Sequence, residues 1–171
     1  MRDFHHRLLA AGSLALAIAL LNVPTADAKR TPPPEPDLRI VQVTLSPEPY
    51  EPQQGVLQLT IQIELPEHLD DTTLLEVSSL LNSPSKRSVR FLTSRQPVGA
   101  PAGQTVTGNP SGSGKPRTSV VLIWDGTDQN KEFARSGRYH YDVRAKLLAA
   151  GEKSPRTLML SWPKRGVIDV K

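Results

Sequence analysis

Few side chains of this sequence have the types and spacing needed for acid–base or nucleophilic chemistry. There is no cysteine, which excludes disulfides, thiolate metal sites, iron–sulfur clusters and cysteine nucleophiles. Beyond residue 28 the chain has only two histidines: His68 in a polar turn, and His140 on the polar face of an expected strand. No G-x-S-x-G elbow is present, and the stretch around Gly114-Lys115 lacks the first glycine and the final Ser or Thr of a phosphate loop. We therefore expect no catalytic residue, no enzymatic activity and no cofactor.

Four oxygen-bearing side chains lie close together in the sequence: Asp125, Asp128, Asn130 and Glu132. Calcium is bound by such oxygens, but the D-x-[DN]-x-[DN]-G-x₅-E spacing of a calcium loop is not met. Asp and Asn also close turns, because their side chains accept a hydrogen bond from a backbone N–H two residues further on. We interpret this group as turn-capping residues and predict no metal site.

Charge is divided unevenly along the chain. Residues 29–85 carry three basic and nine acidic side chains, whereas residues 86–171 carry sixteen basic and six acidic ones. One interpretation is that the second half contacts a polyanion, such as an envelope polymer or an acidic protein. The other is that acidic and basic strands lie side by side and neutralise one another. The candidate polyanion contacts are Lys86, Arg87, Arg90, Arg95, Lys115 and Arg117. Few aromatic residues accompany them, so we expect no nucleic-acid partner.

The elements that must position these side chains are strands. In residues 57–65, apolar side chains alternate with Gln, Thr and Glu, which is the period of a half-buried strand. The same alternation in residues 137–147 separates an apolar face from a charged one. Further strands are expected at 38–45, 89–93, 119–124 and 157–162. Residues 74–81 are ambiguous: Thr73 and Glu76 fit a helix capping box, but the Asn-Ser-Pro-Ser turn at 82–85 favours a hairpin, and we choose a strand.

These elements predict an all-β fold, an Ig-like or fibronectin-like sandwich of two sheets and about seven strands. We place the sandwich at residues 38–163. A proline-rich tail at 29–37 precedes it, and residues 164–171 are expected to form a C-terminal tail. Residues 96–117 are rich in Gly and Pro and are expected to form one long surface loop.

The N-terminus has the pattern of a secretory signal peptide. Basic residues in the first seven positions precede 14 uncharged residues from Leu8 to Leu21, and Ala26-Asp-Ala28 provides an A-x-A cleavage site. A helix of this length spans only about 21 Å, less than the ~30 Å of a bilayer core. We predict cleavage after Ala28, export to the periplasm or the exterior, and no integral membrane segment after cleavage. Without cysteine we expect no lipidated cysteine as an anchor. Because disulfides are absent too, the hydrophobic core alone must stabilise the fold.

The most specific stretch is residues 119–145, which reads strand, W-D-G-x-D-x-N, a short link, S-G-x-Y-x-Y-x-V-x-A, strand. Trp124 can cover the end of a sandwich core with its large ring. Asp125 suits an Asx turn, Gly126 tolerates a positive φ, and Gly137 lets the chain re-enter the sheet. The turn residues that we predict to be structural are Trp124, Asp125, Gly126, Asp128, Asn130, Gly137, Tyr139 and Tyr141.

This segment resembles the Ig-like domain of the flagellar hook-capping protein, a sandwich that is also found at the ends of many exported bacterial enzymes and surface proteins. All of these turn residues except Asn130 match its motif one by one, whereas Lys131 stands where that family often has a nearby glycine. A weaker similarity to small β-sandwich protease inhibitors involves the same few residues. The resemblance implies a fold and says little about function, because one sandwich serves many roles. A signal peptide and the lack of the assembly segment argue against a flagellar role.

Taken together, these patterns predict an exported, non-catalytic Ig-like module of a bacterial cell envelope that binds a protein or an envelope polymer. The alternative is a secreted or periplasmic protease inhibitor with the same fold. Recognition is expected at a sheet edge, at the 96–117 loop or at the turn between Trp124 and Gly137.

Overall fold

The computed structural model describes residues 35–70, 72–98, 115–149 and 155–171. The chain divides into two compact units, Met1–Pro33 and Pro34–Lys171, and all described residues belong to the second. The predicted signal peptide, most of the predicted proline-rich tail and residues 99–114 of the predicted loop lie outside the described residues. At the margins of that loop, strands reach Pro97 on one side and begin at Arg117 on the other.

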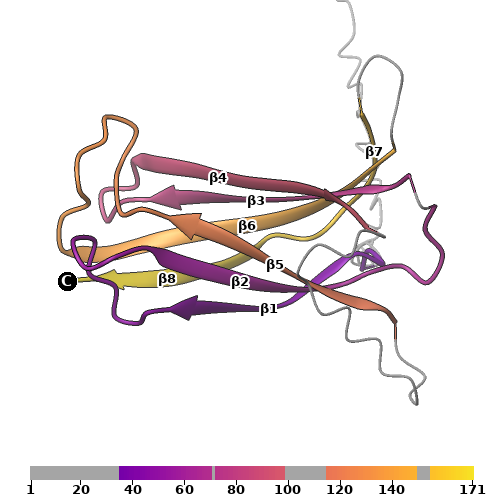
Figure 1. Ribbon diagram of the computed structural model, residues 1–171, viewed down its shortest axis with the longest axis horizontal. Coiled ribbons are helices and arrows are strands. Elements are labelled where there is room, and N and C mark those ends of the chain that lie inside the picture. Colours follow the sequence, from indigo (N-terminus) through magenta and orange to yellow (C-terminus); the bar gives the residue numbers. More distant parts are fainter. Residues whose placement is uncertain (1–34, 71, 99–114, 150–154) are drawn as a thin grey trace, which may run out of the picture. The chain divides into compact units, whose positions relative to one another are not determined.

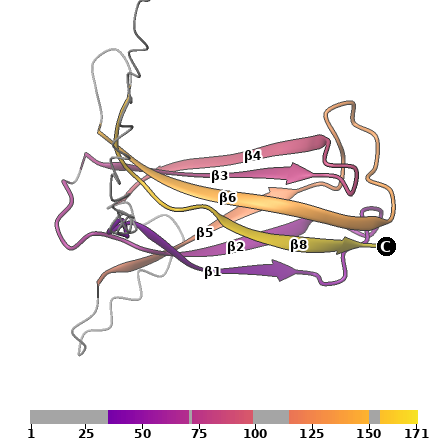
Figure 2. The ribbon, with the colours of Figure 1, turned by 180° about the vertical axis from the view of Figure 1, so that it is seen from behind.

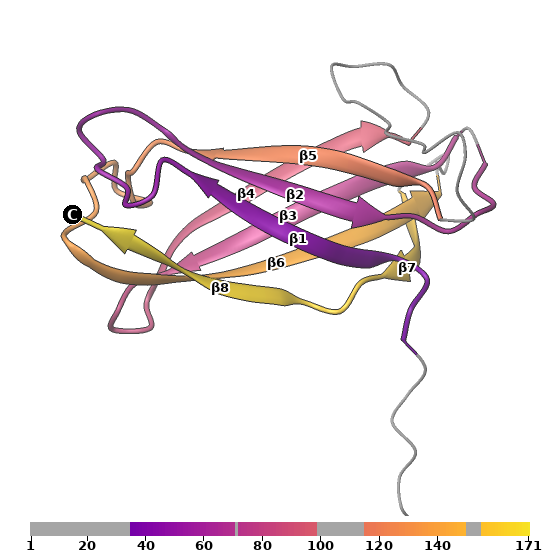
Figure 3. The same ribbon diagram turned by 90° about the horizontal axis from the view of Figure 1, so that it is seen from below.

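In the described part of the chain, eight strands form two antiparallel sheets that pack face to face (Figures 1 and 2). The smaller sheet has the order β1-β2-β5, and the larger has the order β4-β3-β6, with β7 and β8 both paired to β6. The strands are β1 (Arg39–Ser46), β2 (Leu57–Glu64), β3 (Leu74–Asn82), β4 (Ser88–Pro97), β5 (Arg117–Trp124), β6 (Gly137–Ala149), β7 (Arg156–Leu160) and β8 (Lys164–Val170). Figure 3 looks onto the three-stranded sheet, with the larger sheet behind it.

The predicted all-β sandwich is therefore confirmed. β7 pairs with one end of β6 and β8 with the other, so together they occupy one strand position along the edge. Counted in this way, the sandwich has the expected seven positions. Residues 74–81, which the sequence left between helix and strand, lie within β3 and pair with both β4 and β6.

The prediction of a C-terminal tail at 164–171 is wrong. This segment forms β8, and its Ile168 and Val170 side chains are buried in the core. Pro163 and the charged pair Lys164-Arg165 indicated an end to the sheet. Pro163, however, stands between β7 and β8, so its missing N–H interrupts no hydrogen bond between paired strands. The sandwich thus extends to the last residues of the sequence.

The core lies between the inward faces of the sheets. Leu57, Leu59, Ile61 and Ile63 alternate along β2 and are fully buried, and each contributes roughly 1.5–3 kcal/mol by leaving water. On β6 the alternate residues Tyr139, Tyr141 and Val143 face the same core, as the sequence predicted. Trp124, at the end of β5, is fully buried among them.

The outward face of the larger sheet carries ion pairs between neighbouring strands. Glu76 on β3 accepts a hydrogen bond from Arg95 Nε on β4 at 3.1 Å and lies 3.6 Å from Lys146 Nζ on β6. Asp142 accepts a hydrogen bond of 2.9 Å from Arg165 Nε on β8. Acidic and basic strands are thus side by side, which agrees with the second interpretation of the uneven charge.

Candidate binding site at the turn end of the sandwich

The β1–β2 loop, the β3–β4 hairpin, the β5–β6 turn and the C-terminus gather at one end of the sandwich, on the left in Figure 1. We call this the turn end. It contains the segment 125–136, where the sequence analysis placed its most specific motif. Its geometry decides whether that motif is a structural turn, a metal loop or a recognition surface.

Asp125 and Asp128, two of the three acidic residues of the turn, are held by hydrogen bonds within it. Asp125 Oδ1 accepts hydrogen bonds from Thr127 N at 3.0 Å and from Thr127 Oγ1 at 2.8 Å, which closes an Asx turn. Asp128 Oδ1 accepts from Asn130 N at 2.7 Å and from Glu132 N at 3.0 Å. These are the hydrogen bonds expected of turn-capping aspartates, and Asn130 takes part through its backbone N–H.

Backbone contacts add further support to the turn. Ala134 N donates to Gly126 O at 2.8 Å, and Thr127 and Phe133 form an isolated antiparallel bridge. Lys131 has a φ of 66°, a left-handed conformation that a side chain disfavours and glycine adopts freely.

Three buried aromatic rings lie beneath the turn. Trp124 stands between Tyr50 and Tyr139, with ring centroids 5.4 Å and 5.8 Å away, and its Nε1 donates to Thr127 O at 2.8 Å. Tyr139 donates its hydroxyl to Arg135 O, four residues upstream, at 3.0 Å. Such a hydrogen bond, from a tyrosine near the start of a strand back to the preceding corner, is the tyrosine corner of Ig-like sandwiches. The buried rings therefore hold the turn against the core through hydrogen bonds to its backbone carbonyls.

Gly126 marks the closest approach between the turn and the β1–β2 loop. Its φ is 77°, and a Cβ placed there would lie 2.6 Å from Pro52 Cβ and 2.6 Å from the Tyr50 hydroxyl. The same hydroxyl donates to Gly55 O at 3.0 Å. Burial, and then the nearby negative charge of Asp125, raise the pKa of Tyr50. Only glycine fits at this position, both for its backbone angle and for its contacts.

Arg90 joins the edge strand β4 to the turn. Its Nη1 donates to Asp128 O at 3.2 Å, and its Nη2 lies 3.9 Å from Asp125 Oδ2. The pKa of Asp125 is lowered, first by the hydrogen bonds from Thr127 and then by the charge of Arg90. Arg90, a candidate polyanion contact, is thus already used within the molecule.

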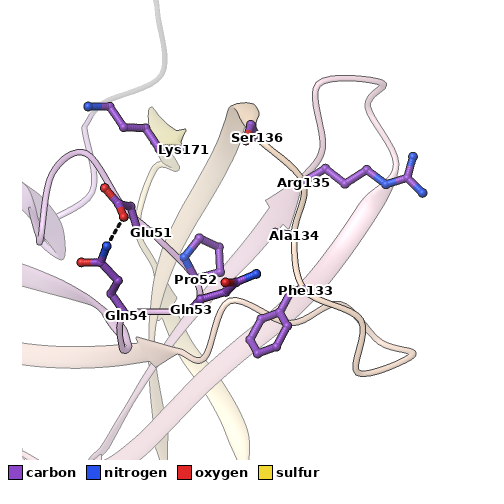
Figure 4. A pocket seen from close by; sticks show the side chains of 9 residues that line it. All are labelled: Glu51, Pro52, Gln53, Gln54, Phe133, Ala134, Arg135, Ser136 and Lys171. Carbon is purple, nitrogen blue, oxygen red and sulfur yellow. Dashed lines mark hydrogen bonds between the residues drawn. The ribbon is translucent and has the colours of Figure 1, made fainter.

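One hollow of about 480 Å³ lies between the segment 133–136, the turn at 51–54 and Lys171 (Figure 4). Glu51 accepts a hydrogen bond from Gln54 on its rim. Arg135 extends away from the other labelled side chains in Figure 4, so the cations of this hollow do not converge on one point. Its lining is mainly amide and charged side chains around Pro52 and Phe133.

A second hollow of about 620 Å³ lies on the other side of the same segment, against the β3–β4 hairpin. Phe133 borders both hollows and is 56% exposed. Around it the lining is rich in hydroxyl and amide groups: Ser83, Ser85, Ser88, Gln129, Asn130 and Ser136. An aromatic surface surrounded by such groups is able to bind a partner by contact and hydrogen bonding together.

The six candidate polyanion contacts do not form one cluster. Lys86 and Arg87 lie in the β3–β4 hairpin at the turn end, whereas Arg95, Lys115 and Arg117 lie at or next to strand ends away from it. Four of the six have carboxylate neighbours: Arg90 with Asp125, Arg95 with Glu76, Lys115 with Asp37 and Arg117 with Glu64. Only Arg87 lines the second hollow. Polyanion binding stays a prediction, and these contacts do not assemble a site for it.

The remaining chemistry-bearing residues are far from one another. His68 lies in the β2–β3 connection, and His140 lies near the start of β6, at the turn end. Among the residues that the structure describes, no group of three or more His, Asp or Glu side chains is placed to hold a metal ion. In the same part of the chain, no helix has the length and apolar character needed to cross a membrane.

Sequence reasoning missed two contributors to this end of the molecule. Tyr50 follows two prolines in a segment interpreted as a break between strands, and no local pattern signals its burial against Trp124. Phe133 lies in the short link between the two halves of the motif. A large aromatic residue in an otherwise polar turn was the available signal for it.

Comparisons with known proteins give limited information. No family model matches the sequence, and no curated protein matches it. The resemblance to the hook-capping domain therefore stays a prediction. Among solved structures, the chain is similar to a bacterial adhesin from Mobiluncus mulieris that contains intramolecular disulfide, isopeptide and ester bond cross-links. The TM-score is 0.41 and the identity 7%, with 79% of this chain and 58% of the adhesin chain covered.

Proposed function

We propose that the protein is an exported, non-catalytic binding module of the bacterial cell envelope, and that it recognises its partner through the turn end. The observation that carries this proposal is Phe133, an exposed aromatic side chain between two hollows on a turn fixed by its own hydrogen bonds. A preorganised loop loses little conformational freedom on binding, which favours affinity.

The chemistry of the surroundings supports binding over catalysis. Asp125 and Asp128 each use Oδ1 to accept backbone hydrogen bonds that close the turn, which gives both carboxylates a structural role. The second hollow offers hydroxyl, amide and guanidinium donors around an aromatic ring. Such a lining suits a peptide or a polymer that carries both apolar and polar groups.

Export is part of the proposal and rests on the N-terminal sequence pattern. The expected result is that protein recovered from outside the cytoplasm begins at Lys29, which N-terminal sequencing of the purified chain measures. Full-length protein retained in the cytoplasm would contradict export and would leave the binding test below unaffected.

Phe133→Ala tests the binding site. Wild-type chain and variant are incubated with an isolated envelope fraction, and the amount retained is measured against protein concentration. Loss of a central aromatic contact is expected to weaken retention by about tenfold or more. Phe91→Ala is the matched control, because Phe91 is 60% exposed on β4 and borders neither hollow.

Equal retention of both variants would contradict a site at the turn end. The same proteins are assayed against a panel of serine proteases, which separates the alternative function. Stoichiometric inhibition that Phe133→Ala abolishes and Phe91→Ala preserves would identify an inhibitor and overturn the proposed envelope module.

A further inference from the structure

The two sheets have four outer edge positions, and most of them carry features that block pairing with another strand. An edge strand presents unpaired N–H and C=O groups, and proteins protect such edges with bulges, prolines and charges. Here the edge positions are β1 and β5 in the three-stranded sheet, and β4 and β7–β8 in the other.

Three of the four edges are protected. The β1 register shifts between Ile40 and Gln42, and Pro47 follows the strand directly. β4 carries Arg90 and Arg95, and its register with β3 shifts near the hairpin. The β7–β8 edge has a register shift opposite Leu147 and Leu148, and it is interrupted at Pro163. Each of these edges is bent, interrupted or charged.

The fourth edge, β5, has none of these features along most of its length. Its eight residues pair with β2 without a register shift, from Leu57 opposite Trp124 to Glu64 opposite Arg117. The strand contains no proline, and its only charged residue is Arg117 at the start. Its centre, Val120-Val-Leu-Ile123, consists of residues with high strand propensity. A straight, uncharged edge of this kind is a template for another strand.

The surface beside the centre of this edge is uncharged as well. Val121 and Ile123 point outward on β5 and are 44% and 57% exposed. Beside them on β2 and β1 the outward rows contain hydroxyl and amide side chains: Gln42, Thr44, Ser46, Gln58, Thr60 and Gln62, with Ser119 on β5 itself. Charged residues of this face stand at the start of β5, where Arg117 is paired with Glu64 and Glu64 lies opposite Arg39. Two copies of a chain with net charge +4 repel one another, and this face brings no like charges together.

We propose that β5 pairs antiparallel with β5 of a second copy of this chain, joining the two three-stranded sheets into one. A two-fold axis at Val121 places Val121 opposite itself and Ile123 opposite Ser119 of the second copy. The same register places Arg117 opposite Asp125 of the second copy, twice by symmetry. These side chains are 55% and 53% exposed and carry opposite charges, and Arg117 Nη2 also lies 3.1 Å from Glu64 Oε2 of its own chain. In this register the strand is therefore complementary to itself in charge.

Engineered cysteines test both the pairing and its register, since the chain has no cysteine of its own. Residues directly opposite in antiparallel strands have Cα atoms about 4.5–5.5 Å apart, which a disulfide spans. The protein is purified from cells that express the full chain, so that any processing takes place. Under mild oxidation Val121→Cys is expected to form a covalent dimer in high yield, measured by non-reducing gel electrophoresis.

Ile123→Cys is the matched control. It is more exposed than Val121 and would cross-link at least as well by random collision, yet the proposed register leaves it without a cysteine opposite. A mixture of Ser119→Cys and Ile123→Cys chains is expected to cross-link where neither does alone. If the Ile123→Cys chain by itself cross-linked in higher yield than the Val121→Cys chain, this register would be overturned.

A second measurement needs no new bond. Sedimentation of the wild-type chain at about 100 μM is expected to give twice the monomer mass, and Val121→Lys is expected to restore the monomer because two like charges meet across the axis. Val41→Lys, the same change on the protected β1 edge, is expected to leave the dimer intact. A monomeric wild-type chain would overturn the proposal. It would do so even if a strand of another protein were found to pair with β5, because the proposed partner is a second copy of this chain. This inference does not depend on the binding function proposed above.

Discussion

The turn end and the outward face of the larger sheet hold the same fold together in different ways. At the turn end, buried aromatic rings pack against one another beneath the turn, and Gly126 lies in close contact with Pro52 and Tyr50. On the sheet face, exposed arginines and lysines meet carboxylates of neighbouring strands. A buried, closely packed contact loses much of its stabilising free energy when one atom is added or removed. An exposed ion pair contributes little free energy, because water screens its charges. The comparison predicts that sensitivity to mutation is concentrated at the turn end.

The largest effect is expected for Gly126→Ala. A left-handed backbone angle costs about 1–2 kcal/mol with a side chain, and the clash with Pro52 and Tyr50 about 1–3 kcal/mol more. Chemical denaturation should therefore show a loss of about 2–5 kcal/mol. Gly55→Ala is the control, because Gly55 also has a positive φ but a Cβ added there would have no atom within 4 Å. A loss of less than about 2 kcal/mol for Gly126→Ala would show that the close contact is unimportant, because backbone strain alone accounts for about 1–2 kcal/mol.

A smaller loss at the same end is expected for Tyr139→Phe. The variant removes the hydroxyl that donates to Arg135 O and leaves that carbonyl without this partner, at a cost of about 1 kcal/mol. Tyr141→Phe is the matched change two residues further on. Within the described residues, no hydrogen bond from the Tyr141 hydroxyl is found. The free energy of unfolding of Tyr141→Phe in denaturant should therefore be nearly that of the wild type. A similar loss in both variants would contradict the tyrosine corner as the cause.

On the sheet face, Glu76→Gln is expected to lower stability at pH 7 by up to about 1 kcal/mol. The hydrogen bond from Arg95, and then the positive charges nearby, hold the pKa of Glu76 below its ordinary value of 4.5. A carboxylate with a lowered folded-state pKa stabilises above its unfolded pKa, and this contribution is lost as the pH falls through the folded value. Wild type and variant should therefore converge below about pH 4.5 in thermal melts. A constant gap down to pH 2 would exclude ionisation as the source.

The smallest effect is expected for Arg138→Ala. Arg138 Nε lies 3.3 Å from Asp169 Oδ1, and the two side chains are 70% and 56% exposed. The change in unfolding free energy should stay within about 0.5 kcal/mol, with little dependence on salt. A loss comparable to that of Tyr139→Phe would remove the contrast between the two regions.

Much of the sandwich was predictable because alternation reports which side of a strand is buried. Residues 57–65 and 137–147 showed that pattern, and both form strands with the expected faces. The turn was predictable because Asp125 and Asp128 act on N–H groups only two to four residues away. Local chemistry of this kind is visible in a sequence.

Contacts between distant segments were not visible. Alternation does not show which strand lies at an edge, so the exposed position of β5 had no signature. Arg90 and Arg95 looked like a free basic group because their carboxylate partners lie 19 or more residues away in sequence. β8 was missed because Lys164, Arg165 and Gly166 weaken its alternation, while its place in the sheet comes from pairing with β6.

The pairing of β8 also joins two distant parts of the chain. Lys171 N donates to Tyr50 O and Tyr50 N donates to Asp169 O, both at 2.9 Å, so the β1–β2 loop is held by residues far along the sequence. Contacts of such long sequence separation form slowly, because the entropy of closing the intervening chain is lost first. We therefore expect the turn end to be among the last parts of the sandwich to reach its native structure.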